Sequence, residues 1–231
     1  MTSATYYLTP NAAGTAFTGT GYTPDGTIPA GAIPCTQEQV QNWQQYVPSN
    51  GEIVAAPDSV LLQQAQSAQI ALVTKGYNAA TDYVPVTING TTYQVDNTAG
   101  KQALNLSLTI TANAMLNSPA WAASTEYTAG AYCNVGGVIL FCSASGKSGA
   151  SAPTPPTTFG TPVTDGTAAW ELLGRKVYLQ GGSFVYMTPQ QIMSAFQQGE
   201  LYLHQMSDQL ELLKSEIMAA TTVTEVQTYT F

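Results

Sequence analysis

Apolar side chains recur along residues 188–221 at alternating spacings of four and three. The series comprises Ile192, Phe196, Gly199, Leu203, Met206, Leu210, Leu213 and Ile217, and only Gly199 lacks an apolar side chain. Thr188, Pro189 and Gln191 supply the N-cap, first-turn and capping-box residues that are typical of a helix start. The pattern therefore predicts a helix over 188–221 with one continuous apolar stripe.

Two interpretations of this stripe are open: it lies on the chain's own core, or it forms a coiled coil between copies of the chain. Four heptads and a length of about 45–50 Å favour the coiled coil. Mixed Leu, Ile and Met do not separate a dimer from a trimer. We expect a homotrimer of fibre type, with an interface formed by Ile192, Phe196, Leu203, Met206, Leu210, Leu213 and Ile217.

Three further helices are predicted upstream. The first covers residues 36–47, with Thr36 and Gln39 as a capping box. The second covers residues 58–75, where Gly76 provides a stop signal. The third covers residues 99–117 with Asn97 or Thr98 as its cap, and its apolar positions are Leu104, Leu108 and Met115 with Ala112 beside them.

Short hairpins connect these helices. The alternating runs 85–88 and 91–95 flank Asn89-Gly90, which strongly favours a tight hairpin turn. A second hairpin is predicted over 175–187, turning at Gly181-Gly182. Residues 1–35 are rich in Gly, Thr and Pro, and we expect an extended arm without a core of its own that lies on a partner or on a neighbouring copy.

The apolar period changes from helical to two over residues 119–174. A hairpin of 131–135 and 138–142 and a last strand over 168–172 predict a small all-β module. The fold class is therefore α+β: a long C-terminal heptad helix with helical partners and short hairpins, plus an inserted all-β module. The expected divisions are 1–57 (arm and short helix), 58–118 (first helical part), 119–174 (β module) and 175–231 (second helical part).

Charge is scarce and negative. Charged residues make up 9% of the chain, which is 44% hydrophobic and carries a net charge of −8; soluble domains average roughly 25% charged residues. With no Lys/Arg run we expect no nucleic-acid binding and no anionic-membrane binding. No N-terminal signal peptide and no bilayer-length apolar run is visible. A chain made in a cytoplasm and released by lysis, without membrane insertion, fits this composition.

Candidate chemical groups are few. Cys35, Cys133 and Cys142 are expected to be reduced, because their odd number and the hairpin geometry argue against a disulfide. The single histidine, His204, lies on the flank of the heptad helix. Asp165 belongs to a turn and Glu171 to a strand. Motifs of known enzyme classes are missing, so we predict no enzyme activity, no metal site and no cofactor.

Aromatic residues are concentrated in the β module, and their role has two interpretations. A module of this size without disulfides needs rings to build its core. Exposed rings would instead stack on the apolar faces of sugars, with neutral polar groups bonding the hydroxyls. The glycan-binding candidates are Trp121, Tyr127, Tyr132 and Trp170.

Two groups of motifs resemble known families. "WAASTEYTAG" at 121–130, "GGVILFCSASGKSGASAPTPP" and "VTDGTAAWELLG" resemble the small carbohydrate-binding β modules of chitinases, which phage tail and fibre proteins also use. The flanks "VTINGTTYQVDNTAGKQAL" and "LKSEIMAATTVTEVQTY" resemble a helical domain of phage tail-fibre and tail-assembly proteins. The chain departs from that family at its end, which reads "TYTF" where many relatives have Gly-Trp-Pro.

These resemblances imply a structural component of a bacteriophage tail, either a tail fibre or a baseplate-associated protein, located in the virion. Its partners would be sister subunits, other tail proteins that contact the N-terminal arm, and a host cell-surface glycan bound by the β module. The alternative is an assembly chaperone for the tail fibre, which would not be retained in the virion.

Overall fold

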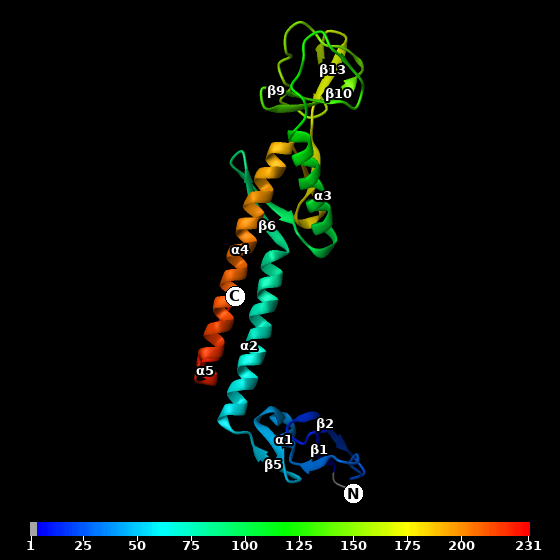
Figure 1. Cartoon of the computed structure of the whole chain (residues 1–231). Helices are drawn as coiled ribbons and strands as arrows, with labels where there is room; N and C mark the ends of the chain where they lie inside the picture. Colours follow the sequence, from blue (N-terminus) through cyan, green and yellow to red (C-terminus); the bar gives the residue numbers. More distant parts are fainter. Residues whose placement is uncertain (1–3) are drawn as a thin grey trace. The chain divides into compact units, whose positions relative to one another are not determined.

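The computed structural model describes residues 4–231 and has the predicted α+β composition, with five α-helices and several small antiparallel sheets. The chain divides into two units. The first unit comprises Met1–Val73 with Leu212–Phe231, and the second comprises Thr74–Glu211. Each of the two long helices, α2 (Asp58–Thr81) and α4 (Pro189–Ala219), contributes residues to both units (Figure 1).

The first unit begins with a three-stranded antiparallel sheet of order β2-β1-β3, formed by β1 (Thr5–Pro10), β2 (Phe17–Thr23) and β3 (Ile33–Cys35). Leu8 and Phe17 are buried in it. The Asn11 carboxamide oxygen accepts the Thr15 amide proton at 2.9 Å and closes the turn between the first two strands. The prediction of an extended arm without a core is therefore wrong: this turn folds the segment onto itself.

Short elements follow this sheet. They are α1 (Gln37–Gln41), a 3₁₀ turn at Trp43–Gln45, and the hairpin β4 (Tyr46–Ser49) and β5 (Glu52–Ala55). The predicted Thr36–Gln39 capping box is present. The helix predicted over 36–47 is shorter than expected, because the chain leaves it to pair β4 with β5.

A buried glutamine joins the two long helices in the first unit. The Gln66 side-chain amide of α2 donates to the carbonyl oxygens of Ile217 and Met218 at 3.2 Å and of Ala220 at 3.3 Å. These carbonyls lie at the C-terminal end of α4, where helix carbonyls have no intrahelical partner. The short helix α5 (Val223–Val226) follows, and its Val226 is buried, as is Ile217.

Helix α2 runs six residues past the predicted end at residue 75 and stops at Thr81. The expected stop at Gly76 was wrong because a distant side chain completes the longer helix. Asn97 donates from its amide to the Thr81 carbonyl at 3.0 Å, and the Thr81 hydroxyl donates to the Tyr77 carbonyl at 3.0 Å. A long-range contact of this kind overrides a local stop signal.

The second unit has a helical part built on two hairpins. Its elements are β6 (Tyr83–Ile88), β7 (Thr91–Asp96), α3 (Ala99–Leu116), β14 (Arg175–Tyr178), β15 (Phe184–Met187) and the first part of α4. The predicted turn is present, with positive φ at both Asn89 and Gly90. The core comprises Val84, Val86, Ile88, Ala112, Val177, Met187 and Ile192.

The β module of the second unit contains β8 (Glu126–Tyr127), β9 (Tyr132–Val135), β10 (Val138–Ala144), β11 (Gly146–Lys147), β12 (Val163–Asp165) and β13 (Ala168–Leu172). Its main sheet is antiparallel with order β12-β13-β10-β9 (Figure 1). Leu140 pairs with Cys133 as the hairpin predicts. Both faces of β10 are covered: Leu140 is buried in the module's core, and Ile139 in a cluster with Met115 of α3.

Candidate functional site

One buried carboxylate organises the core of the β module. Asp165 Oδ2 accepts the indole N–H of Trp121 at 2.7 Å and that of Trp170 at 3.0 Å. Its Oδ1 accepts the Gly149 amide proton at 2.7 Å. Asp165 is 5% exposed. Since a buried carboxylate requires such donors, these bonds make Asp165 a structural residue of the module.

The four predicted glycan-binding rings belong mainly to this interior. Trp170 is fully buried and presents no face to a ligand, so the prediction that it stacks on a sugar does not hold. Tyr127 packs edge-on against Trp170 with the ring centroids 4.7 Å apart, and its hydroxyl accepts the Ala122 amide proton. Trp121 is half-buried against the same core.

Tyr132 lies on the other face of the sheet. Its ring packs against Phe141, with the centroids 5.9 Å apart, and its hydroxyl lies 3.4 Å from Arg175 Nη2, which donates to it. Both rings pack on the cluster that joins the module to α3. Tyr132 is thus half-buried, and its hydroxyl accepts a hydrogen bond from Arg175.

All three cysteines are free thiols, as expected. Burial raises the pKa of Cys133 from 9.0 to about 12, with further contributions from the charge of Asp165 and from Cys142. Burial also raises the pKa of Cys142 and of Cys35. A protonated thiol is a poor nucleophile and metal ligand, so the buried pair acts as apolar core.

Other candidate chemistry is sparse within residues 4–231. No group of three or more His, Cys, Asp or Glu side chains there is placed to hold a metal ion. None of the helices in this range combines the length and apolar character needed to cross a membrane. His204 is exposed on α4.

The heptad stripe of α4 is covered unevenly by the chain itself. Ile192, Leu210 and Ile217 are buried, whereas Phe196 is 37% exposed. The three remaining apolar side chains, Leu203, Met206 and Leu213, are half-buried. The single chain therefore packs much of the stripe against its own residues, and a continuous coiled-coil seam between copies is not shown.

Strand β6 provides part of this cover in the second unit. The Gln198 side chain accepts the Thr87 amide proton at 2.7 Å and donates to the Thr87 carbonyl at 3.1 Å. Gly199 lies beside Val84, because a Cβ at this position would make an ordinary van der Waals contact of 3.4 Å with Val84 Cγ1. The chain's own hairpin thus packs against the glycine that interrupts the apolar series.

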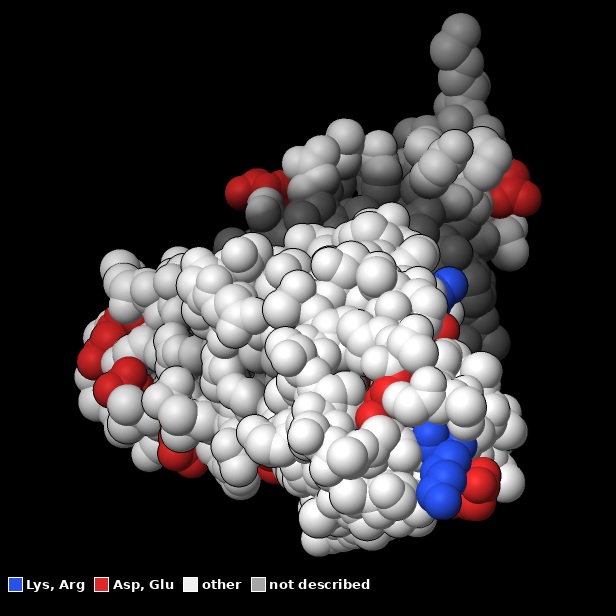
Figure 2. Space-filling view, turned by 90° about the horizontal axis from the view of Figure 1, so that it is seen from above, with Lys and Arg blue, Asp and Glu red and all other residues white. Residues whose placement is uncertain are grey.

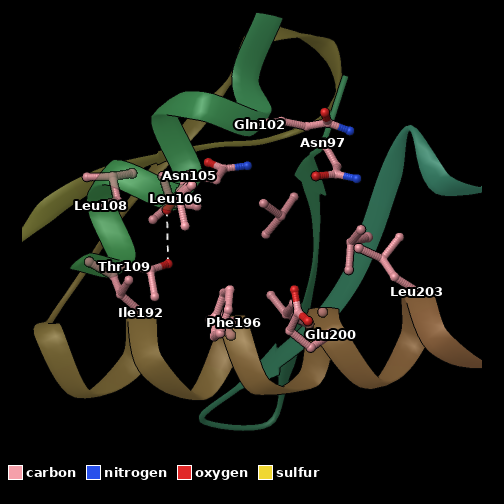
Figure 3. A pocket seen from close by; sticks show the side chains of 16 residues that line it. Asn97, Gln102, Asn105, Leu106, Leu108, Thr109, Ile192, Phe196, Glu200 and Leu203 are labelled. Atoms are coloured by element: carbon pink, nitrogen blue, oxygen red, sulfur yellow. Dashed lines mark hydrogen bonds between the residues drawn. The ribbon is translucent and has the colours of Figure 1, made fainter. Parts of the chain in front are cut away.

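An apolar groove remains open in the second unit between α3 and α4 (Figure 3). Its volume is about 320 Å³. Phe196 extends from α4 into the space that faces Leu106 and Thr109 of α3, and Glu200 is the charged residue of the lining. The remaining lining is Val84, Val86, Val95, Asn97, Gln102, Asn105, Leu108, Val177, Ile192, Ala195, Gly199 and Leu203.

A second apolar stripe lies uncovered on α3 beside this groove. It comprises Ala99, Ala103, Leu106, Ile110 and Ala114, at spacings of four, three, four and four, and all five are exposed. Leu106 is 55% and Ile110 62% exposed. The apolar stripe predicted from the sequence lies on the opposite face of α3, where Ala112 and Met115 are buried. The exposed stripe gives a weaker signal in the sequence, because alanines are weak markers of an apolar face.

The surface is largely neutral. On the face that Figure 2 shows, broad areas carry no charged side chain, and Lys and Arg residues lie beside acidic ones. The whole chain has six Lys and Arg and fourteen Asp and Glu among 231 residues.

Comparison with known proteins does not assign the chain to a family. No protein-family model, no curated protein and no solved structure matches it. The resemblance to phage tail proteins therefore rests on the motifs at 86–104, 121–130, 136–156, 163–174 and 213–229 alone.

Proposed function

We propose that the chain is a homotrimeric structural component of a bacteriophage tail, located in the virion, whose β module binds a glycan on the host surface. The motif resemblances support the tail assignment, and the charge-poor composition suits a subunit held in a large assembly. The observation that carries the oligomer is the uncovered apolar stripe of α3 beside an open apolar groove.

Another copy of the chain is the occupant that best matches this surface. The groove lining contains one charged residue, Glu200, so it favours a partner face that is equally poor in charge. The chain itself is only 9% charged. The alanines of the stripe let a second helix approach closely, and the stripe extends over about 22 Å of helix, or four turns. In a closed trimer each copy would cover the exposed stripe of its neighbour.

The test is to place charge on the stripe without disturbing the subunit. The double variant is Leu106→Asp/Ile110→Asp. Because Leu106 and Ile110 are both more than half exposed in the single chain, the variant subunit should still fold. We expect the trimer to dissociate to monomer, measured by size-exclusion chromatography with light scattering. The matched control is Leu72→Asp on α2, a leucine that is 60% exposed and distant from the groove in sequence.

A double variant that keeps the mass of the unmodified protein would contradict this interface. Substitutions in the buried part of the α4 stripe are less informative. Leu210 is 6% exposed, so an aspartate there would unfold the subunit as well as any oligomer.

The tail assignment has a separate test. Mass spectrometry of purified virions from the phage that encodes the chain should detect it in stoichiometric amounts. Its presence in lysates but not in virions would instead favour the chaperone alternative.

A further inference from the structure

A second depression in the second unit lies on the face of the β module that meets α3, and β15 contributes to its lining. It measures about 380 Å³, which is in the range of small-ligand pockets. Its lining combines three aromatic rings with one acidic and one basic residue. The residues are Phe141, Phe159, Gly160, Glu171, Leu172, Leu173, Gly174, Arg175 and Tyr186. None of the four rings predicted from the sequence lines it.

The pairing of the strands determines which side chains form the base of this cleft. Phe141 pairs with Tyr132 on one side and with Glu171 on the other, so the three side chains form a row across β9, β10 and β13. Because side chains alternate along a strand, this row faces away from the core that contains Trp170. Phe141 and Glu171 are thereby held on rigid strands.

Aromatic side chains from two other segments form the walls. Phe159 lies directly over Gly174, where an added Cβ would come within 2.5 Å of Phe159 Cε1. Tyr186 of β15 lies beside Phe159 with the centroids 5.7 Å apart, and it remains 44% exposed. Phe184 supports Tyr186 edge-on at 5.7 Å. Gly174 leaves room for the Phe159 ring, which is half-buried, while Tyr186 is exposed.

The charged side chains of the cleft are one acceptor and one donor. Glu171 offers carboxylate oxygens, and the Arg175 guanidinium offers N–H groups. Tyr132 holds Arg175, whose Nη2 donates to its hydroxyl at 3.4 Å. A simple anion would be repelled by Glu171 and a simple cation by Arg175. A neutral ligand that both donates and accepts hydrogen bonds suits the pair.

We propose that this cleft is the saccharide-binding site of the chain, and that its ligand is a neutral pyranoside. The apolar face of the sugar ring would lie on Phe159 and Tyr186, while its hydroxyls donate to Glu171 and accept from Arg175. This inference rests on the glycan-binding part of the proposed function, and it assigns that role to residues outside the predicted set.

Saturation-transfer NMR on the full chain tests the proposal with four neutral probes: chitotetraose, cellotetraose, maltotetraose and mannotetraose. We expect one of them to bind with a Kd on the order of 1 mM. Phe159→Ala and the isosteric Glu171→Gln should each weaken binding by about tenfold or more. The matched control Tyr22→Ala removes an exposed ring of β2, which is 66% exposed, and should leave binding unchanged.

The outcomes separate the cleft from the broader proposal. If a probe binds and both cleft variants bind it as the unmodified protein does, the cleft assignment is overturned while glycan binding stands. If none of the four probes transfers saturation at about 10 mM, both the cleft and the glycan role are overturned. If Phe159→Ala proves unstable, Glu171→Gln still tests the cleft, because glutamine keeps the shape of the glutamate side chain.

Discussion

The second unit contains two aromatic groups that differ in how they are held. In the first group, Trp121 and Trp170 donate their indole N–H groups to the Asp165 carboxylate, and Tyr127 packs edge-on against Trp170. The second group, Phe159, Phe184 and Tyr186, stacks around the cleft, where Phe184 and Tyr186 stay nearly half exposed.

The difference shows that aromatic content does not indicate which rings are free to bind. A ring whose polar atom bonds to a buried carboxylate stabilises the interior. Rings that the chain leaves uncovered, although they are apolar, are the ones available to another molecule. The same distinction separates the buried residues of the α4 stripe from the exposed stripe of α3.

The largest expected effect comes from Trp170→Ala in the buried group. Loss of this fully buried side chain should lower the free energy of unfolding by about 3–5 kcal/mol. Phe184→Ala in the exposed group should lower it by less than about 1 kcal/mol. Urea denaturation followed by near-UV circular dichroism measures both. Equal losses in the two variants would contradict the distinction between the groups.

A smaller loss is expected when the centre of the buried group is changed. Asp165→Asn replaces an oxygen acceptor by an amide donor that faces indole or amide N–H groups, and should cost about 2–3 kcal/mol in the free energy of unfolding. The matched control is Asp25→Asn, an exposed aspartate that also precedes a glycine in a turn. We expect the denaturation midpoint of the control to stay close to that of the unmodified protein. A similar shift in Asp165→Asn and Asp25→Asn would show that Asp165 only forms a turn.

The last prediction concerns Cys133, which lies in the same core and whose titration changes stability only above about pH 9. Its thiol has a pKa of about 12 in the folded chain, raised from 9.0, so the protonated form stabilises the fold. This contribution is complete below about pH 9 and is lost as the pH rises toward 12, with a limiting slope of about 1.4 kcal/mol per pH unit. Over this range the free energy of unfolding should change less with pH in the variant Cys133→Ala than in the unmodified protein. Identical pH slopes would mean that the thiol titrates normally in the folded chain.

Local patterns in the sequence predicted much of the fold. Asn89-Gly90 forms the expected turn, Thr188 and Gln191 form the expected capping box, and the hairpin register of Cys133 with Leu140 is correct. Each depends on residues close in sequence. Two of the errors, the end of α2 and the fold of the N-terminal segment, arise from contacts between separate segments: Asn97 with Thr81, and the sheet that buries Leu8 and Phe17.

The candidate site was less predictable for a similar reason. Tyr132, Phe141 and Glu171 come together only through strand pairing, and Tyr186 joins them from a hairpin outside the module. Phe159 lies in a proline-rich loop that has no periodic pattern. Exposure of a ring is decided by these long-range contacts, which explains why the rings that the sequence favoured belong largely to the interior.

The proposed trimer requires that other copies cover the apolar surface that one chain leaves exposed. Its mass can be measured by light scattering of the unmodified protein after size-exclusion chromatography. We expect a particle of three times the chain mass of 24.3 kDa. A particle of 24.3 kDa that persists as the protein concentration is raised would contradict it.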